Sequence, residues 1–170
     1  AMAMLTYDDE LYYFKGASAE KIDEYESLQT LKISNDGSTV AFVDYDDGAY
    51  VFYTYANGKI NEICEYENGH TYDSFVMSPN GGTILYTVYE DGDNVLYAYN
   101  GEEIEIGKDF SPVAVSDGGK VAYIYDDDSD KLCVIKNLDE STKETVDSEF
   151  SRLTALTTDA TAILYRNEDG

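Results

Sequence analysis

The residues that could carry hydrolytic chemistry are scarce in this sequence. A serine triad needs a general base beside its nucleophile, and the one histidine, His70, follows Asn68-Gly69 in a segment that reads as a loop. The Gly-x-Ser-x-Gly turn that presents the nucleophile of many hydrolases is absent. Only two arginines, Arg152 and Arg166, are present, so a cluster of arginines that clamps a substrate carboxylate is disfavoured. We expect a protein that is not an enzyme.

Acidic turns are the second candidate for chemistry, because oxygen ligands from carboxylates can bind calcium. The clearest acidic runs are Asp44 to Gly48, Glu90 to Asn94 and Asp126 to Asp130. An EF-hand loop requires a glutamate at its twelfth position, and counting from each run finds Tyr55, Gly101 and Asn137 there. We therefore expect no cofactor, and solvated hairpin turns are the default interpretation, with weak calcium binding at these turns as the alternative.

Charge and cysteine content limit the remaining functions. The 35 acidic residues outnumber the 11 lysines and arginines, which gives a formal net charge of −24. Such a surface repels nucleic-acid phosphates and anionic lipids, and no stretch approaches the roughly 18 apolar residues of a membrane helix. Cys64 and Cys133 lie in separate apolar strand patterns, where thiols pack as small hydrophobic groups. We expect a protein or peptide partner, a basic one if charge decides, with no nucleic acid and no membrane insertion by this domain.

These residues lie on a chain that repeats itself about every 40 residues. Each copy has an apolar residue, a turn rich in Ser, Asn, Asp and Gly, and a β-branched or aromatic strand. The anchors Ile33, Met77, Val115 and Leu156 are 44, 38 and 41 residues apart. A period near 40 with several strands per copy is typical of propeller blades. We predict an all-β fold, either a β-propeller or a propeller fragment, of about four four-stranded antiparallel blades.

Boundaries for the repeats follow from the same pattern. We predict one β-propeller-like domain over residues 1–170. Its repeats are expected at about 1–27 (partial), 28–70, 71–109, 110–150 and 151–170 (partial). Asn57-Gly58 and Asn100-Gly101 predict hairpins between third and fourth strands, and a longer turn is expected over residues 137–141.

The turn-and-strand pattern resembles the WD-repeat-like units of the TolB propeller and of propeller domains in prolyl-oligopeptidase-type proteins. It is carried by Ser34 to Phe42, by Ser78 to Tyr86 and, one residue shorter, by Ser116 to Tyr123. The copy at Thr157 to Tyr165 departs from it, with Ala160 in the place of a glycine.

The resemblance implies blades used mainly as a scaffold that contacts proteins or peptides. The oligopeptidase relatives carry a separate hydrolase domain, and its nucleophile motif is missing here. We expect a non-enzymatic binding or scaffold domain. The alternative is an accessory propeller domain of a larger hydrolase or surface-anchored protein whose catalytic part is absent here.

The expected contact surface is the rim of the propeller channel. The first strand of each blade lines that channel, and loops on a rigid scaffold are the usual place for binding. The loops that enter the first strands supply the partner-binding candidates His70, Tyr72, Phe110, Phe150 and Arg152. The alternative is that Phe110 and Phe150 only fill junctions between blades. The 17 tyrosines could build a carbohydrate platform, but their strand positions indicate core packing.

Two arrangements of the chain ends are open. Residues 9–24 read as the last two strands of a blade and residues 151–167 as the first two, so that together they could close a four-bladed ring. Met4 to Tyr7 can instead pair locally with Leu11 to Lys15, which closes a much shorter loop. We favour this open arc, in which exposed blade edges would pair two chains as a homodimer.

Location follows only from the resemblance. Proteins with such repeats are often periplasmic or surface-exposed, and the acidic surface agrees with that. The two cysteines argue the other way, because oxidising compartments favour paired cysteines. We expect an extracytoplasmic domain, periplasmic or at the cell surface.

Overall fold

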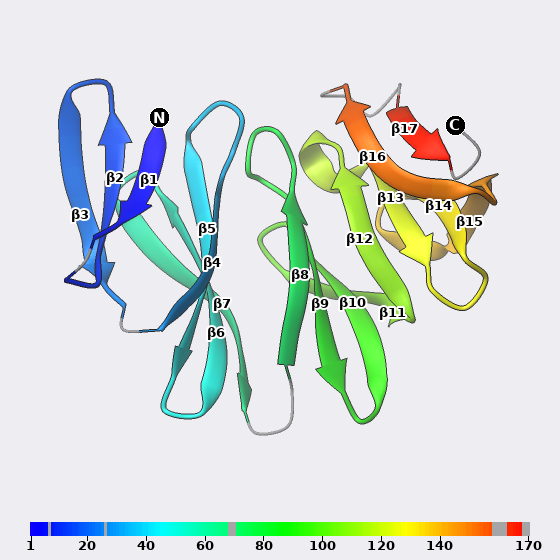
Figure 1. Ribbon diagram of the computed structural model, residues 1–170, viewed down its shortest axis with the longest axis horizontal. Helices are drawn as coiled ribbons and strands as arrows, with labels where there is room; N and C mark the ends of the chain where they lie inside the picture. Colours follow the sequence, from blue (N-terminus) through cyan, green and yellow to red (C-terminus); the bar gives the residue numbers. More distant parts are fainter. Residues whose placement is uncertain (7, 26, 68–70, 158–162, 168–170) are drawn as a thin grey trace. The chain divides into compact units, whose positions relative to one another are not determined.

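The computed structural model describes residues 1–6, 8–25, 27–67, 71–157 and 163–167, and most of them lie in antiparallel strands (Figure 1). The chain divides into two compact units, Ala1–His70 and Thr71–Gly170, which we describe separately. That the 170 residues form a single domain stays a prediction.

The first unit contains two antiparallel sheets. One has the order β1-β2-β3, with β1 (Met2–Leu5), β2 (Glu10–Lys15) and β3 (Ser18–Glu24). The other has the order β4-β5-β6-β7, with β4 (Leu28–Ile33), β5 (Thr39–Asp46), β6 (Ala49–Ala56) and β7 (Lys59–Glu67). Each strand pairs only with its neighbours in sequence, so each sheet is a meander of the kind that forms a propeller blade.

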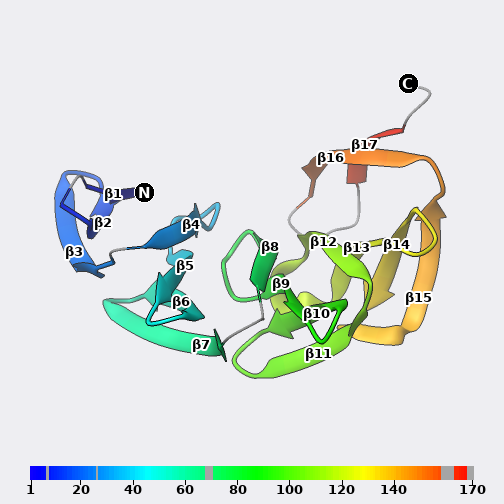
Figure 2. The same ribbon diagram turned by 60° about the horizontal axis from the view of Figure 1, so that its bottom comes forward.

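The second unit contains two four-stranded meanders and one pair of strands (Figure 2). The first meander has β8 (Thr71–Met77), β9 (Ile84–Glu90), β10 (Asp93–Tyr99) and β11 (Glu103–Lys108). The second has β12 (Phe110–Val115), the short 3-10 helix η1 (Asp117–Gly119), β13 (Val121–Asp126), β14 (Lys131–Lys136) and β15 (Asp139–Asp147). The last pair is β16 (Phe150–Leu156) and β17 (Ile163–Asn167). The predicted all-β architecture of four-stranded antiparallel blades is confirmed, with partial sheets at both ends of the described chain.

The local hairpin forms at the start of the chain. β1 pairs with β2 from Met2↔Phe14 to Leu5↔Leu11, and β3 pairs with the other edge of β2. The position beside β2 that a closed four-bladed ring would give to Ile163–Arg166 is therefore occupied. Pairing of two chains through blade edges stays a prediction.

One hydrogen-bond pattern closes the turn between the first and second strands of all three complete blades. A serine hydroxyl accepts a hydrogen bond from the backbone N–H five residues later, and the serine N–H donates to the carbonyl of that same residue. The hydroxyl bonds are Thr39 N to Ser34 Oγ (3.0 Å), Thr83 N to Ser78 Oγ (3.0 Å) and Val121 N to Ser116 Oγ (2.9 Å). The backbone bonds measure 2.9, 2.8 and 2.9 Å in the same order. The backbone N–H and C=O at the buried start of each second strand are thus hydrogen-bonded.

The third copy of this turn is not one residue shorter, as the sequence alignment suggested. The closing strand pairs are Ile33↔Val40, Met77↔Ile84 and Val115↔Ala122, so the turns have equal length. Val121 occupies the place of Thr39, and Ile124 rather than Tyr123 is equivalent to Phe42. The alignment failed because it matched Tyr123 to the aromatic residues Phe42 and Tyr86, which placed a one-residue gap in the turn.

The hairpin predictions have mixed outcomes. Asn57-Gly58 forms the expected two-residue turn with both φ angles positive (53° and 72°). Asn100-Gly101 belongs to a three-residue loop, because Tyr99 pairs with Glu103. The longer turn expected over 137–141 is wrong, since Lys136 pairs with Asp139 and leaves only Asn137-Leu138 between the strands.

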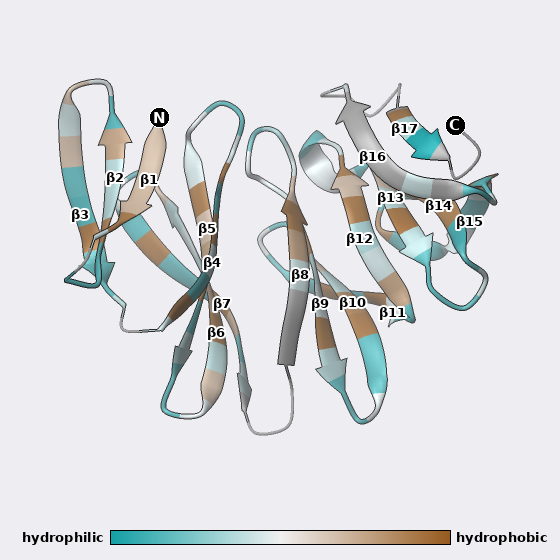
Figure 3. Cartoon of the chain, viewed as in Figure 1, coloured by the Kyte–Doolittle hydropathy of each residue, from teal (hydrophilic) through white to brown (hydrophobic). Residues whose placement is uncertain are grey.

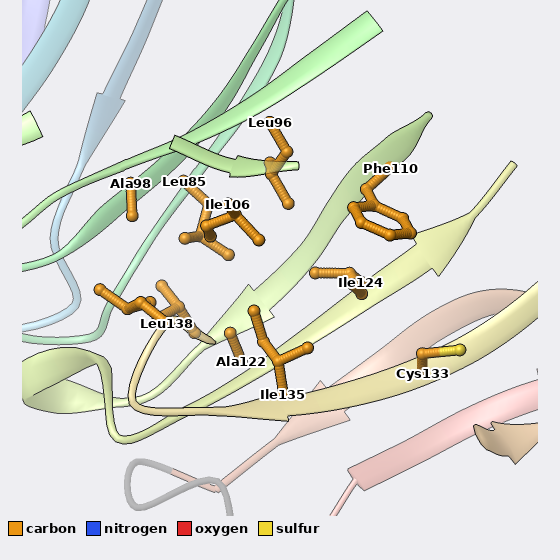
Figure 4. Packing of buried hydrophobic residues seen from close by; sticks show 11 residues of the cluster. Leu85, Leu96, Ala98, Ile106, Phe110, Ala122, Ile124, Cys133, Ile135 and Leu138 are labelled. Carbon is orange, nitrogen blue, oxygen red and sulfur yellow. The ribbon is translucent and has the colours of Figure 1, made fainter. Parts of the chain in front are cut away.

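Separate apolar clusters form where sheets within each unit pack face to face. In the second unit, the cluster joins residues of β9, β10 and β11 to residues of β12, β13 and β14 and to Leu138 in the turn after β14; it includes Leu85, Leu96, Ile106, Ile124 and Ile135 (Figure 4). In the first unit, Leu11, Tyr25, Val40, Phe42 and Tyr55 form the buried cluster. The inner strands are apolar, whereas β3 and β15 carry mostly polar residues (Figure 3). These clusters explain why the third strands carry apolar residues on both faces.

Substitution of two adjacent glycines should separate backbone strain from packing. Gly118 and Gly119 have φ angles of +73° and +68°, so alanine is strained at both. A Cβ on Gly118 meets nothing within 4 Å, but one on Gly119 would lie 3.0 Å from Leu138 Cδ1. We expect Gly118→Ala to cost about 1 kcal/mol and Gly119→Ala to cost about 1–3 kcal/mol more, measured by urea unfolding. Equal losses would contradict the packing of Leu138 into this turn.

Thr83 offers a stabilising substitution in the same family of turns. Its side chain is fully buried, and its hydroxyl has no hydrogen-bond partner among the described residues. The equivalent residue of the next blade is Val121, whose backbone makes the same bond to a serine. We expect Thr83→Val to raise the free energy of unfolding by about 1 kcal/mol, because a buried unsatisfied hydroxyl is removed at nearly constant volume. A loss of stability on urea unfolding would show that the hydroxyl is satisfied in solution.

Candidate functional site

The connections between strands sort into two chemically different ends. In an antiparallel meander, successive connections lie at alternate ends of the sheet. The loop that enters the first strand and the turn between the second and third strands therefore share one end. Hydrogen bonds join them: Tyr45 N donates to Ser27 O (3.2 Å) in the first unit, and Asp127 N donates to Asp109 O (2.9 Å) in the second.

Acidic residues gather at this shared end of each unit, which we call the acidic end. In the first unit it carries Asp8, Asp9, Glu10, Asp23, Glu24, Asp44, Asp46 and Asp47. In the second unit it carries Glu90, Asp91, Asp93, Asp109, Asp126, Asp127, Asp128, Asp130, Asp147 and Glu149. The opposite end, which we call the Asn-Gly end, includes the turns Asn57-Gly58 and Asn80-Gly81. About half of the acidic residues of the chain, 18 of 35, thus lie where the channel-rim loops were predicted.

A hollow of about 530 Å³ opens at the acidic end of the first unit. It lies between the loop from β3 to β4 and the turn from β5 to β6. Its lining residues are Glu24, Ser27, Asp44, Tyr45, Asp46 and Asp47. Asp47 and Gly48 both have positive φ angles (47° and 92°) in a two-residue turn, which fixes the backbone beside the hollow.

The ring of Tyr45 lies beside the carboxylates of this hollow. Tyr45 is 42% exposed, and its ring centroid lies 4.8 Å from that of Tyr50 on the paired strand. Burial, followed by the charge of Asp23 and smaller contributions that include Asp44, raises the pKa of the adjacent Tyr25 well above its ordinary value. An exposed aromatic ring beside carboxylates is a surface suited to ammonium or guanidinium groups.

Lysines at the acidic ends are paired with carboxylates. Lys21 Nζ contacts Glu10 Oε1 at 2.8 Å and Glu24 Oε1 at 2.5 Å, and these two hydrogen bonds, the one to Glu10 first, raise the pKa of Lys21 above its usual range. Lys108 Nζ contacts Asp93 Oδ2 at 2.5 Å. Over the whole sequence, 35 acidic residues stand against 11 lysines and arginines, so the acidic residues far outnumber the basic ones.

Lys143 makes a bridge to a buried carboxylate. Its Nζ lies 2.9 Å from Asp126 Oδ2 and 4.5 Å from the centroid of the Phe110 ring. Asp126 is 7% exposed and also accepts a hydrogen bond from Ser129 N (3.1 Å). Burial alone would raise the pKa of Asp126, but the bonds from Lys143 and Ser129 outweigh it and hold that pKa below the ordinary value. This arrangement ties the β13–β14 turn to strands β12 and β15.

The predicted partner-binding residues do not form one described site. Phe110 is 3% exposed and lies in the cluster between sheets, the position expected for a residue that fills a blade junction. Tyr72 lies in β8, where it pairs with Val88 of β9, and Phe150 and Arg152 lie in β16. The side chains of these three residues are outside the described structure. His70 lies outside the described residues. Partner binding by these residues stays a prediction, and the structure adds the burial of Phe110, which depends on packing that the loop sequence alone does not reveal.

Metal-ligating groups and thiols add little to the site. Among the described residues, no three His, Cys, Asp or Glu side chains are grouped so that they could hold a metal ion. Weak calcium binding at the acidic turns remains an untested expectation. Cys133 is buried and Cys64 half-buried, and they lie on different strands as thiols.

Comparison with known proteins identifies the fold. No family model and no curated protein sequence matches the chain. The structure of TolB from Acinetobacter baumannii matches 95% of this chain and 43% of its own, with a TM-score of 0.62 at 15% identity. The chain has a β-propeller fold. A putative TolB from Agrobacterium tumefaciens matches 84% of this chain and 57% of its own, with a TM-score of 0.55 at 19% identity.

Propellers of peptidases are also similar to this propeller. Pyrococcus horikoshii acylaminoacyl peptidase matches 90% of this chain and 31% of its own, with a TM-score of 0.60 at 14% identity. The chain spans about half the length, or less, of these three structures. At such identities the likeness shows the fold alone, so the resemblance predicted from the turn pattern is confirmed as a resemblance of fold. Across the described residues, no helix has the length and apolar character needed to cross a bilayer.

The Asp126 bridge predicts a pH-dependent stability. Because the folded-state pKa of Asp126 lies below its unfolded value, the bridge stabilises the protein above the unfolded pKa, and this contribution is lost as pH falls through the folded pKa. We expect Asp126→Asn to lower the free energy of unfolding by about 1–3 kcal/mol at neutral pH and to have little effect below both pKa values. Exposed Asp128→Asn is the control. An equal loss at both pH values would contradict the charge-dependent role.

Proposed function

We propose that this propeller domain is a non-enzymatic binding domain that contacts a basic protein or peptide segment through its acidic end. The observation that carries the proposal is the hollow of the first unit, where Glu24, Asp46 and Asp47 stand beside the half-exposed ring of Tyr45. Carboxylates attract ammonium and guanidinium groups, and an aromatic face adds a cation–π contact. Glu24 is already bridged to Lys21, so the negative charge offered to a partner comes mainly from Asp46 and Asp47, on a chain whose formal net charge is −24.

The loops that surround the acidic end suit a binding surface. They are held in place by backbone hydrogen bonds such as Tyr45 N to Ser27 O, and by the fixed two-residue turn at Asp47-Gly48. A preorganised surface loses less conformational entropy when a partner binds. An extracytoplasmic location, periplasmic or at the cell surface, is part of the proposal, and so is the absence of catalysis.

The second candidate function is an accessory propeller of a larger hydrolase. The match to an acylaminoacyl peptidase over 31% of its length favours it, because there the similar region is a minor part of a longer protein. A reading frame that continues into a hydrolase domain would support this alternative over a stand-alone scaffold. Hydrolysis of peptide or ester substrates by the 170-residue chain alone would contradict both.

Binding of a basic peptide tests the proposal. We expect an arginine- and lysine-rich decapeptide to bind with micromolar affinity in isothermal titration calorimetry. Its affinity should fall at least about tenfold between roughly 0.05 M and 0.5 M salt, because exposed charges are screened. The double variant Asp46→Asn, Asp47→Asn should weaken binding, and asparagine tolerates the positive φ of residue 47.

A matched control removes two exposed charges elsewhere, with Glu62→Gln and Glu102→Gln. Equal weakening by the control would indicate a general effect of net charge and not a site at the acidic end. No binding of the basic peptide at low salt, by a folded protein, would contradict the proposal.

A further inference from the structure

A second hollow, of about 220 Å³, lies at the Asn-Gly end of the first unit. The turns β2–β3, β4–β5 and β6–β7 all reach this end, so the hollow forms where sheet β1-β2-β3 meets sheet β4-β5-β6-β7. Its lining residues are Tyr13, Lys15, Glu20, Ser38, Tyr55, Asn57 and Gly58. Unlike the acidic end, this hollow brings together one cation, one anion, an amide, a hydroxyl and two aromatic rings.

The aromatic part of the hollow is fixed by its own contacts. The Tyr13 hydroxyl donates a hydrogen bond to Gly37 O at 2.5 Å, which ties β2 to the β4–β5 turn. The ring centroids of Tyr13 and Tyr55 lie 5.5 Å apart with an angle of 55° between the rings. Tyr55 is only 4% exposed, so this pair is a rigid wall and not a mobile surface group.

Glu20 reaches across the hollow from β3 to the β6–β7 turn. Burial, and then a hydrogen bond with Glu20, raises the pKa of Tyr55 to about 12. Glu20 Oε1 also lies 3.7 Å from the place that a Cβ on Gly58 would occupy. Gly58 has a φ angle of +72°, and because it has no side chain, this edge of the hollow stays open.

We propose that this hollow binds one neutral pyranose ring of a carbohydrate. Sugar hydroxyls both donate and accept hydrogen bonds; here Asn57 can do both, Lys15 donates and Glu20 accepts. The Ser38 hydroxyl donates to Asp36 Oδ1 at 2.8 Å, so it can accept a bond from a sugar hydroxyl. The half-buried ring of Tyr13, backed by Tyr55, offers an apolar face for the C–H groups of such a ring. The volume is below that of a drug-sized pocket, which suits one ring. A ligand with a carboxylate is disfavoured, since the chain carries a formal net charge of −24.

Titration of the ¹⁵N-labelled protein with simple glycosides tests this site. The probes are methyl α-D-glucopyranoside, methyl β-D-galactopyranoside and N-acetylglucosamine. We expect at least one of them to shift the backbone amides of Ser38, Asn57 and Gly58 saturably, with a Kd in the millimolar range typical of so small a ligand. The amides of Asp46 and Asp47, at the other end of the unit, should not move.

A matched pair of variants on one turn makes the test specific. Asn57→Gly removes the side-chain amide and keeps the positive φ of 53° that this turn requires, so the fold should survive. It should weaken glycoside binding at least about tenfold, the effect of losing a well-placed hydrogen-bonding group. Lys59→Gln changes the residue that directly follows the Asn57-Gly58 turn and does not line the hollow, so it should leave the Kd unchanged.

Three results would overturn the proposal. One is the absence of saturable shifts with all three glycosides in the folded protein. Another is an unchanged Kd in Asn57→Gly. The third is saturation of the same amides by glycine or L-alanine without any glycoside effect, which would assign the hollow to a zwitterion. None of these results depends on whether the acidic end binds a basic peptide.

Discussion

The bond between a serine hydroxyl and the backbone N–H five residues later is the interaction on which the blades depend. It recurs at Ser34, Ser78 and Ser116, and each time it closes the turn into the most buried strand of a blade. That strand must begin in register, because a slip by one residue would turn its apolar side chains to the wrong face. A short polar side chain that replaces missing backbone partners therefore sets the register of an apolar sheet.

The same alternation of turns also divides the surface into two ends with different chemistry. Strand edges and turns must be kept soluble, and acidic residues serve this purpose throughout the chain. The two ends differ in composition, because Asp and Glu dominate the acidic-end turns, whereas the turns of the opposite end mix Asn, Gly and Ser with carboxylates such as Asp36 and Asp117. A rigid scaffold with a charged end and a mixed polar end can present two unlike surfaces, and the two proposed sites lie at these opposite ends of the first unit.

Much of the fold could be predicted from the sequence, because turn chemistry and strand patterning are local. The period of about 40 residues and the Asn57-Gly58 hairpin needed no tertiary information. The Asn137-Leu138 turn was missed because leucine rarely adopts a positive φ; here its side chain is buried against Gly119. The burial of Phe110 and both hollows depend on packing between segments far apart in sequence. Tyr45 meets Tyr50 across a local hairpin, but it meets Ser27, just as Tyr13 meets Tyr55 and Gly37, only when strands of separate hairpins pack together.

Backbone chemical-shift mapping with an arginine-rich peptide most directly tests whether the acidic end is the binding surface. The ¹⁵N-labelled chain would be titrated at low salt, where charge interactions are least screened. The largest shifts are predicted at Ser27 and Asp46–Gly48 in the first unit and at Asp91–Asp93 and Asp127 in the second. Shifts concentrated at Asn57-Gly58, Asn100-Gly101 and Asn137-Leu138, or spread evenly over both ends, would contradict the assignment of binding to the acidic end.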